Sequence, residues 1–383
     1  MSRQSTLTNL PCTREESLAR KYCEIAFELA DHGTPRLLVC WPAARMNKFQ
    51  SLLYRCAPDC GFAVERISDL AELDEIFWPG DIVFNAHWFG PLRNGVADAD
   101  ELQANIDTAF ATFDTFRART GAKFVWSGHN LRPHRTAHRE VEIALRKRIL
   151  AEFDAVHLLD RNHASELANT YNVDIGHWFN VGHPHYGGAY ADHIERAEAR
   201  EWIGFDPGAR ILLFFGSIQP YKGIRRLIAD FRAARAQGYD DLRLVIAGFP
   251  SDKDYVAEIS DETSRDPAIR YVPSKVPDDD IQTYFRAADA AVLPYSGDQL
   301  NSGAAMLALS FDCPVIAPNE PAFERLSRYG IALYDNKDPG GLERALVDFD
   351  HRAIKTDFGA FRRNHDSRII SRAFFENLKA LFD

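Results

Sequence analysis

Short apolar runs recur along the chain, and each is followed by a longer, more polar segment of helical length. This alternation predicts buried parallel strands joined by helices. In the first half, the runs that predict strands are 36–41, 81–85, 123–126 and 155–159. In the second half, they are 210–215, 242–247, 290–294 and 313–317. The pattern therefore predicts two successive α/β layers, each built on a parallel sheet.

The segment 178–188, WFNVGHPHYGG, separates the two sets of runs. Its Gly and Pro residues disfavour regular structure, so we expect an interdomain connection with the boundary within 182–188. The expected domains are 1–184 and 185–357, which suits a chain of 383 residues. The stretch 358–383 has an amphipathic helical pattern with no strand after it. It can pack on either domain, and we assign it to the N-terminal one.

Composition narrows the class of protein. Hydrophobic residues make up 46% of the chain and charged residues 26%, as in a soluble globular protein. No run approaches the length of a membrane-spanning helix, and the N-terminus has no signal-like apolar segment, so we expect a cytoplasmic protein. The net charge of −10 argues against general nucleic-acid binding.

Two local features qualify this picture. The six cysteines are scattered, and the close pair Cys56 and Cys60 has no second pair to complete a zinc site, so reduced structural thiols are expected. The segment 132–148, from Arg132 to Arg148, is basic in an acidic chain. This basic segment can make peripheral contact with the inner face of an anionic membrane. An ordinary solvated helix is the alternative.

The strongest chemical signal is a predicted strand-to-helix turn. The run 210–215 ends at Gly216, and Lys222 with Gly223 opens a segment with apolar residues at helical spacing. A glycine lets a ligand approach the backbone closely, and the free N–H groups of a helix start beside a lysine favour a diphosphate. Both GxGxxG and GxxxxGK[ST] are absent from this turn, and GxGxxG does not follow the first strand either, which disfavours a nicotinamide enzyme or a kinase loop. An ordinary turn with a surface lysine is the alternative.

The second signal follows the run 290–294. A loop with Gly and Asn residues leads to Asn301 and Ser302, either of which can cap the almost wholly apolar segment 303–309. Such a helix is buried, so its N-terminus lies at the mouth of the sheet and offers the amides of Ser302 and Gly303 to an anion. A plain capped core helix is the alternative.

Taken in order, these pieces resemble the GT-B glycosyltransferases that use nucleotide sugars, in particular bacterial group 1 enzymes that build exopolysaccharide or glycolipid. In the C-terminal half the matching stretches are 216–223, 247–250, 271–281, 284–290, 293–295, 301–303 and 314–316. Weaker matches in the N-terminal half are 85–88, 126–134 and 182–186.

The resemblance implies an α/β protein of the GT-B fold, with two Rossmann-like parallel-sheet domains facing across a cleft. The domain 1–184 would bind the acceptor and the domain 185–357 the nucleotide sugar. The implied enzyme is a metal-independent hexosyltransferase with no cofactor, which moves a sugar from a nucleotide-diphosphate donor, UDP- or GDP-linked, to a saccharide or lipid-linked saccharide.

Residue roles follow from the same resemblance. The implied catalytic residues are His129, Lys222 and His87, the histidines as candidate bases. The implied donor-binding residues are Gly216, Ser217, Tyr221, Lys222, Val272, Lys275, Val276, Gln299, Asn301, Ser302 and Gly303. The implied acceptor-side residues are His87, Trp88, Asn130 and His134.

One departure from the family pattern affects these roles. Many retaining members carry two glutamates in the region that matches 299–307, and this chain has none there. Asp298 and Gln299 are candidate substitutes, with a solvated loop face as the alternative. The departure keeps open a catalytically silent nucleotide-sugar-binding protein. A sugar-nucleotide epimerase of the same fold, which would need paired catalytic acids, is a separate alternative.

Overall fold

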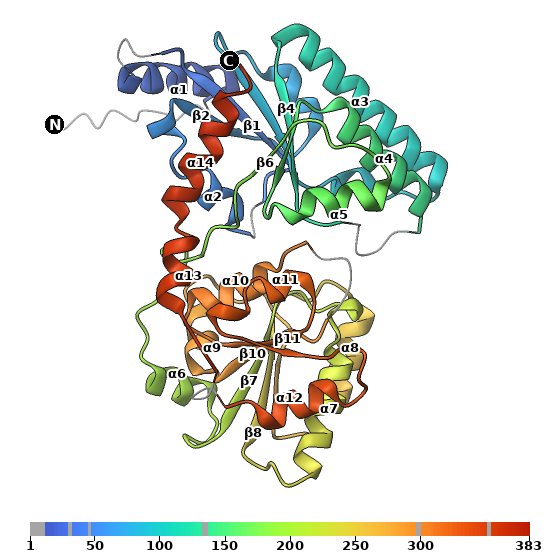
Figure 1. Cartoon of the computed structure of the whole chain (residues 1–383), viewed down its shortest axis with the longest axis vertical. Coiled ribbons are helices and arrows are strands. Elements are labelled where there is room, and N and C mark those ends of the chain that lie inside the picture. Colours follow the sequence, from blue (N-terminus) through green and yellow to red (C-terminus); the bar gives the residue numbers. More distant parts are fainter. Residues whose placement is uncertain (1–11, 30–32, 45–46, 132–136, 296–299, 351–353) are drawn as a thin grey trace, which may run out of the picture. The chain divides into compact units, whose positions relative to one another are not determined.

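The computed structural model describes residues 12–29, 33–44, 47–131, 137–295, 300–350 and 354–383. The chain forms two compact units (Figure 1). The first unit comprises Met1–Gly128, Thr136–Val181 and Ser371–Asp383, and the second comprises His129–Arg135 and Gly182–Ile370.

The first unit is built on a six-stranded, wholly parallel sheet in the order β2-β1-β3-β4-β5-β6. Its strands are β1 (Arg36–Trp41), β2 (Phe62–Arg66), β3 (Ile82–Ala86), β4 (Lys123–Gly128), β5 (Ala155–Leu158) and β6 (Trp178–Asn180). Its helices are α1 (Arg14–Leu29), α2 (Phe49–Leu53), α3 (Ala99–Thr120), α4 (Arg139–Glu152) and α5 (Asn162–Tyr171), with short 3-10 turns η1 (Pro58–Cys60), η2 (Leu70–Glu75) and η3 (Gly90–Arg93).

The second unit repeats this plan with a parallel sheet in the order β12-β11-β10-β7-β8-β9. Its strands are β7 (Arg210–Phe215), β8 (Leu242–Ala247), β9 (Ile269–Val272), β10 (Ala290–Val292), β11 (Val315–Pro318) and β12 (Ile331–Tyr334). Its helices are α6 (Arg196–Ile203), α7 (Ile224–Ala236), α8 (Lys253–Thr263), α9 (Ile281–Ala287), α10 (Gly303–Ser310), α11 (Pro321–Glu324), α12 (Gly341–Asp348) and α13 (Phe358–Asn364), with turns η4 (Pro220–Lys222) and η5 (Ser327–Tyr329).

Strand β7 has a continuously apolar sequence because helices cover both of its faces. Leu212 and Phe214 belong to a core that also contains the buried faces of α7, α8 and α12. Phe215 points to the other face, where its ring lies 5.0 Å from that of Phe285 in α9. Because helices cover both faces, alternate side chains of the strand are buried in two different cores.

The final helix, α14 (Ser367–Lys379), begins in the second unit, and its residues from Ser371 onward belong to the first. It is drawn in red among the blue elements of the first unit in Figure 1. The Ser371 hydroxyl accepts a hydrogen bond from the Cys56 amide at 2.9 Å, and the Phe374 ring lies 5.0 Å from the His157 ring. The stretch 358–383 is therefore two helices, α13 and α14, in place of the single one predicted.

All eight predicted strands are present, and four more were missed: β2, β6, β9 and β12. These four are the edge strands, two in each sheet. The segment 178–188, where regular structure was not expected, begins with a strand, because Trp178–Asn180 forms β6. That strand is only three residues long, with Trp178 and Asn180 exposed and Phe179 buried, so it has no apolar run.

Two buried histidines lie in a polar network of the first unit. His157 Nδ1 lies 2.9 Å from the Ser127 hydroxyl, and His157 Nε2 lies 2.9 Å from the Val181 carbonyl oxygen. The Asn85 amide donates to the Ser127 hydroxyl at 3.1 Å, and the Tyr54 hydroxyl donates to Asn85 Oδ1 at 2.7 Å. Burial lowers the pKa of His157 to about 4 and the pKa of His87 well below its usual value.

We expect these histidines to make the protein acid-sensitive. The unfolded chain binds a proton at each histidine below about pH 6.5. The folded chain does so at His157 only near pH 4, so stability is lost as the pH falls below about 6.5. Urea unfolding at pH 6.5 and pH 5 should show a loss of about 2 kcal/mol from His157 alone. His157→Asn should reduce this loss, whereas His177→Asn, at an exposed position, should leave it unchanged; equal losses in both variants would contradict the assignment.

Candidate functional site

The centre of the second sheet contains a change of chain direction. From β7 the chain runs outward through β8 and β9, and it then returns to β10 on the other side of β7 and continues outward to β11 and β12. Ligands of open α/β sheets bind beside the carboxyl ends of the strands at such a switch point. Gly216 follows β7 and Leu293–Tyr295 follows β10, so the two predicted motifs begin at this point.

Two glycines allow the loops at this edge to approach closely. Gly223 caps α7 at a φ of 71°, and a Cβ there would lie 2.5 Å from the main-chain oxygen of Pro294. Gly248, which follows β8, has a φ of 147°, and its Cβ would lie 1.7 Å from the main-chain oxygen of Gly216. No side chain fits either position, so the backbone segments after β7, β8 and β10 come together only because glycine is present.

Lys222 joins the two predicted motifs. Its ammonium lies 4.0 Å from the centroid of the Tyr295 ring and 5.0 Å from that of Tyr221. The Tyr295 and Ser302 hydroxyl oxygens are 2.9 Å apart, and Ser302 Oγ accepts from the Ala305 amide at 3.2 Å. Ser302 therefore caps α10 as predicted, and Lys222 lies over the tyrosine that contacts this cap.

The electrostatic state of Lys222 points to an anion. Burial lowers the pKa of its ammonium to about 8. Among the residues that the structure describes, no carboxylate forms an ion pair with it, although 26 such pairs are recorded elsewhere. A desolvated cation costs free energy until it is neutralised. The start of α7 adds the partial positive charge of a helix N-terminus.

The other predicted donor residues lie at the same edge of the sheet at varying depth. Val272 ends the edge strand β9, and its main-chain oxygen accepts from the Gly248 amide at 3.1 Å. Beyond it, Lys275 is exposed and Val276 is buried. Ser217 is half-buried after β7. The structure thus brings together Gly216, Tyr221, Lys222, Ser302 and Gly303 but leaves Lys275 without a recorded contact in the part it describes.

Two predicted residues, Gln299 and His134, lie outside the described residues, as does Asp298. Asn301 is described, and its Nδ2 donates to the main-chain oxygen of His129 at 3.0 Å; the structure groups both residues with the second unit. His129 itself is buried, and Asn130 is half-buried.

His87 lies in the first unit directly after β3. Its side chain is only 2% exposed, its amide donates to the Trp41 carbonyl oxygen, and its Nε2 contacts the Tyr54 hydroxyl. The neighbouring Trp88 is half-buried. Since the His87 ring belongs to the buried polar network, its role as a catalytic base stays a prediction that its exposure does not support.

Two residues at the switch point were missed by the sequence reasoning. Tyr295 lies within the family-like stretch 293–295, but its position under Lys222 depends on packing between two loops. Gly248 lies within the family-like stretch 247–250, and this position needs glycine because the Gly216 backbone approaches it closely. The position of Gly248 directly after a predicted strand was a sequence signal that could have identified it. No sequence signal could have identified Tyr295.

The basic segment 132–148 is not one surface patch. Residues 132–136 lie outside the described part, and α4 follows them. Arg146 is 6% exposed, with its guanidinium 5.4 Å from the Trp126 ring centroid and 5.6 Å from that of Phe89. Arg148 forms hydrogen bonds with Asp107 and Glu152. Arg146 is therefore available neither to solvent nor to a membrane surface, whereas Arg148 is partly exposed.

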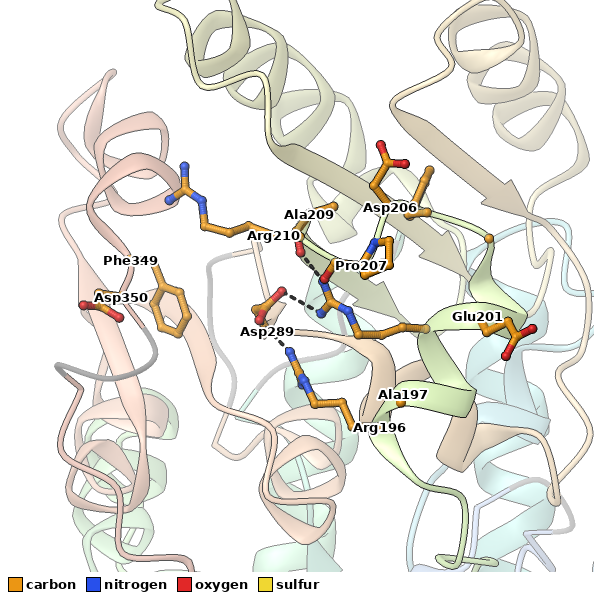
Figure 2. Close-up of a pocket in the computed structure, with 14 residues that line it drawn as sticks. Arg196, Ala197, Glu201, Asp206, Pro207, Ala209, Arg210, Asp289, Phe349 and Asp350 are labelled. Atoms are coloured by element: carbon orange, nitrogen blue, oxygen red, sulfur yellow. Dashed lines mark hydrogen bonds and ion pairs between the residues drawn. The ribbon is translucent and has the colours of Figure 1, made fainter.

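A cavity of about 1210 Å³ lies at the opposite, amino edge of the second sheet (Figure 2). Asp289 lies at its wall and accepts from Arg196 at 2.6 Å, from Arg200 at 3.2 Å and from the Ile211 amide at 2.7 Å. Figure 2 shows Arg196 directed at this carboxylate. These bonds join α6 to the starts of β7 and β10, so the cluster has a structural explanation.

We expect Asp289→Asn to destabilise the second unit. The change leaves two arginines without their shared carboxylate, which costs about 3 kcal/mol for a buried pair. Urea unfolding should show this loss, whereas Asp206→Asn, at a side chain that is 85% exposed, should change stability by less than about 0.5 kcal/mol. Equal effects in the two variants would show that Asp289 has no such role.

Two general properties hold for the described part of the chain. None of its helices is long and apolar enough to cross a membrane. It contains no group of three or more His, Cys, Asp or Glu side chains placed to hold a metal ion. In the described residues, no disulfide joins any of the cysteines; Cys12 and Cys23 are exposed and the others are buried.

Two parallel doubly wound sheets, one of which places at its switch point the starts of α7 and α10 and a desolvated lysine without a described carboxylate partner, have the architecture of the GT-B class. Comparison with known proteins agrees with this class. Residues 209–349 match the family Glycosyl transferases group 1. This match confirms the predicted resemblance to group 1 glycosyltransferases over the C-terminal part of the chain.

Curated relatives match over part of their length. A D-inositol 3-phosphate glycosyltransferase of Mycolicibacterium gilvum is 30% identical over 45% of this chain and 38% of its own length. A second such enzyme, from Catenulispora acidiphila, is 27% identical over 58% of this chain and 55% of its own. A GDP-mannose:glycolipid 4-beta-D-mannosyltransferase of Xanthomonas campestris is 28% identical over 42% and 47%. The chain thus spans about half the length of these relatives, or less.

Solved structures match over nearly the whole chain. The sucrose-phosphate synthase of Thermosynechococcus elongatus superposes with a TM-score of 0.66 at 15% identity, covering 91% of this chain and 99% of that one. Anabaena HepE in complex with UDP and glucose gives a TM-score of 0.63 at 14% identity, covering 90% and 99%. At such identity the likeness shows the fold alone, and it confirms the GT-B prediction.

Proposed function

We propose that the protein is a glycosyltransferase that moves a sugar from a nucleoside-diphosphate sugar to a saccharide or lipid-linked saccharide. The observation that carries the proposal is Lys222, a desolvated cation without a described carboxylate partner at the switch point of the domain that matches group 1 glycosyltransferases. Its surroundings suit a diphosphate better than any neutral ligand.

The chemistry follows from charge. As the bond between the sugar and the diphosphate breaks, negative charge develops on the departing phosphate. Lys222 and the first amides of α7 and α10 supply fixed positive charge for that group without a metal ion. The Tyr295 ring lies against the Lys222 ammonium, and the Tyr295 hydroxyl contacts Ser302 at the start of α10. One side chain therefore links the two groups that we propose for the phosphate site.

UDP- and GDP-linked sugars are the donors that we propose. Support comes from HepE, whose solved complexes contain UDP and UDP-glucose, and from the Xanthomonas relative, whose name states GDP-mannose. The acceptor that we propose is a saccharide or a lipid-linked saccharide, as a step in exopolysaccharide or glycolipid synthesis at the inner face of the membrane. The glycolipid in the name of the Xanthomonas relative supports this choice.

A thermal-shift screen against UDP, GDP, ADP and CMP and their sugars tests the donor site, since a ligand that binds the folded state raises the melting temperature. A nucleoside diphosphate should stabilise the protein, and an assay for released nucleotide with added acceptor should then show transfer. If none of these nucleotides raises the melting temperature, the proposed function is wrong.

Donor affinity should depend on pH in a way set by Lys222. Below about pH 8 the ammonium is protonated before the ligand binds; above it, binding must take up a proton. The dissociation constant for the stabilising nucleotide should therefore be flat from about pH 7 to 8 and then rise by up to about tenfold per pH unit. Lys222→Arg, whose charge persists, should keep the profile flat. A wild-type profile that is also flat would remove Lys222 from the site.

A second candidate is a protein that binds the nucleotide sugar without transferring it. The observation that favours it is the absence of glutamate from 299–307, where many retaining relatives carry two. Nucleotide-induced stabilisation without release of nucleotide, across a broad panel of acceptors, would select this candidate over the transferase.

A further inference from the structure

Tyr295 contacts both groups of the proposed phosphate site and is itself almost entirely buried, with 2% of its surface exposed. Its ring centroid lies 4.0 Å from the Lys222 ammonium, and its hydroxyl oxygen lies 2.9 Å from that of Ser302. Lys222 keeps part of its surface exposed. A ligand can therefore contact the lysine directly, whereas the tyrosine can act on a ligand only through its neighbours.

The surrounding backbone fixes the place of the tyrosine ring. Pro294, directly before Tyr295, lies so close to Gly223 that a Cβ on that glycine would be 2.5 Å from the main-chain oxygen of Pro294. The ring also packs edge-on against Phe323 of α11, with the two centroids 6.3 Å apart. Because Gly223 directly follows Lys222, the close approach of the two loops sets the ring beside the lysine.

A neutral aromatic ring suits a lysine that must keep its charge for a ligand. Burial raises the pKa of the Tyr295 hydroxyl, so the tyrosine stays neutral at physiological pH and is not a counter-ion for Lys222. The negative face of an aromatic ring attracts an ammonium group without neutralising it. The ring therefore restrains the position of the ammonium while its full charge stays available to an anion. A carboxylate at the same place would cancel that charge before the ligand arrived.

The hydroxyl group of the same side chain reaches the start of α10. Ser302 Oγ accepts from the Ala305 amide at 3.2 Å and so caps the helix. The Tyr295 hydroxyl contacts the same Ser302 oxygen, so it restricts rotation of the serine side chain and supports the cap. Because the ring and the hydroxyl belong to one rigid side chain, the positions of the Lys222 ammonium and of the α10 cap are not independent.

We propose that Tyr295 is a positioning residue that couples Lys222 to the start of α10, so that both bind the phosphates of one ligand together. This role rests on the proposed function and adds the residue that arranges its phosphate site. Because the tyrosine acts only on groups that meet the phosphates, its loss should weaken binding of a nucleoside diphosphate and leave binding of the nucleoside unchanged. A tyrosine that only filled the core would alter both affinities or neither.

The test measures binding of UDP, GDP, uridine and guanosine to the full-length protein by calorimetry and saturation-transfer NMR. Tyr295→Leu removes the ring and the hydroxyl and should weaken binding of the diphosphate by about three- to thirtyfold. Tyr295→Phe keeps the ring and should weaken it by about two- to tenfold. Nucleoside binding should stay as in wild type in both variants. Equal losses for the diphosphate and its nucleoside, or no loss for either, would overturn the proposal.

Tyr329→Phe is the matched control for loss of a buried tyrosine hydroxyl. The Tyr329 hydroxyl accepts hydrogen bonds from Arg328 and Asn364 in the same unit, at the opposite edge of the sheet, before β12. This variant should bind the diphosphate and the nucleoside as wild type does. A loss of diphosphate binding as large as that in Tyr295→Phe would mean that the effect of Tyr295 is not specific to the phosphate site.

Two further measurements examine the hydroxyl and the ring separately. In the Ser302→Ala background, Tyr295→Phe should have no further effect on diphosphate binding, because the hydroxyl acts through Ser302; additive losses would refute the coupling. In the ligand-free protein with isotope-labelled lysine, the ring current should shift the Lys222 side-chain protons upfield in wild type and in Tyr295→Phe but not in Tyr295→Leu. Unshifted protons in wild type would refute the contact itself.

These outcomes are separable from failure of the proposed function. Shifted Lys222 protons without a response to any nucleotide would refute the proposed function and, with it, the role of Tyr295 in phosphate binding. A nucleotide response that is equal in wild type and in both Tyr295 variants would refute only the role of the tyrosine.

Discussion

Lys222→Met should make the ligand-free protein more stable while it abolishes nucleotide binding. The lowered pKa means that burial of the ammonium costs free energy in the folded state at neutral pH. Removal of the charge should recover about 1–3 kcal/mol, measured by urea unfolding at pH 7. The methionine stem retains contact with the Tyr295 ring, so packing changes little.

The same substitution should remove the melting-temperature shift by the nucleotide and lower kcat/KM for transfer by about 100-fold or more, as when a charge-stabilising group is lost. Lys147→Met is the matched control, because Lys147 is exposed on α4 in the first unit, away from the switch point of the second sheet. It should leave both stability and ligand response unchanged. If Lys222→Met lowers stability and keeps the nucleotide response, the lysine is structural and the donor site lies elsewhere.

Gly248→Ala should destabilise the second unit severely. Its Cβ would lie 1.7 Å from the Gly216 oxygen, and its φ of 147° strains any other residue. The ends of β7 and β8 would have to separate, with loss of the bond from the Gly216 amide to the Ala247 oxygen at 3.1 Å. We expect a loss of about 3–5 kcal/mol in urea unfolding, together with loss of the nucleotide response.

Gly208→Ala provides the comparison, since a Cβ there meets no atom within 4 Å and the backbone is not in the positive-φ region. Its stability should stay within about 1 kcal/mol of wild type. A small effect of Gly248→Ala would mean that the strand ends adjust easily, and the close approach of β7 and β8 would then not be needed for the site.

These two variants concern different properties of one site. Lys222 contributes charge that is unfavourable until a ligand arrives, whereas Gly248 contributes the space that lets the strand ends converge. A binding site that is more stable when its key charge is removed is the usual sign of function held at a cost to stability. The combination separates loss of chemistry from loss of folding.

The sequence by itself determined the central strands and the helix that closes the switch point. The eight strands predicted from apolar runs are the four inner strands of each sheet, because only strands with both faces covered need an unbroken run of apolar residues. The missed strands β2, β6, β9 and β12 are edges, whose residues are partly exposed and more polar. Ser302 as a helix cap was also predictable, since capping depends on local spacing.

Tertiary structure alone decided how the site is assembled. Lys222 and Tyr295 are far apart in the chain, and they meet because β7 and β10 are neighbours in the sheet, an order that no local pattern contains. The burial of Arg146 near two aromatic rings is a second example. From composition alone, this arginine was expected to lie on the surface. Local periodicity reports which residues must be buried, whereas the pairing of strands determines which buried or charged groups become neighbours.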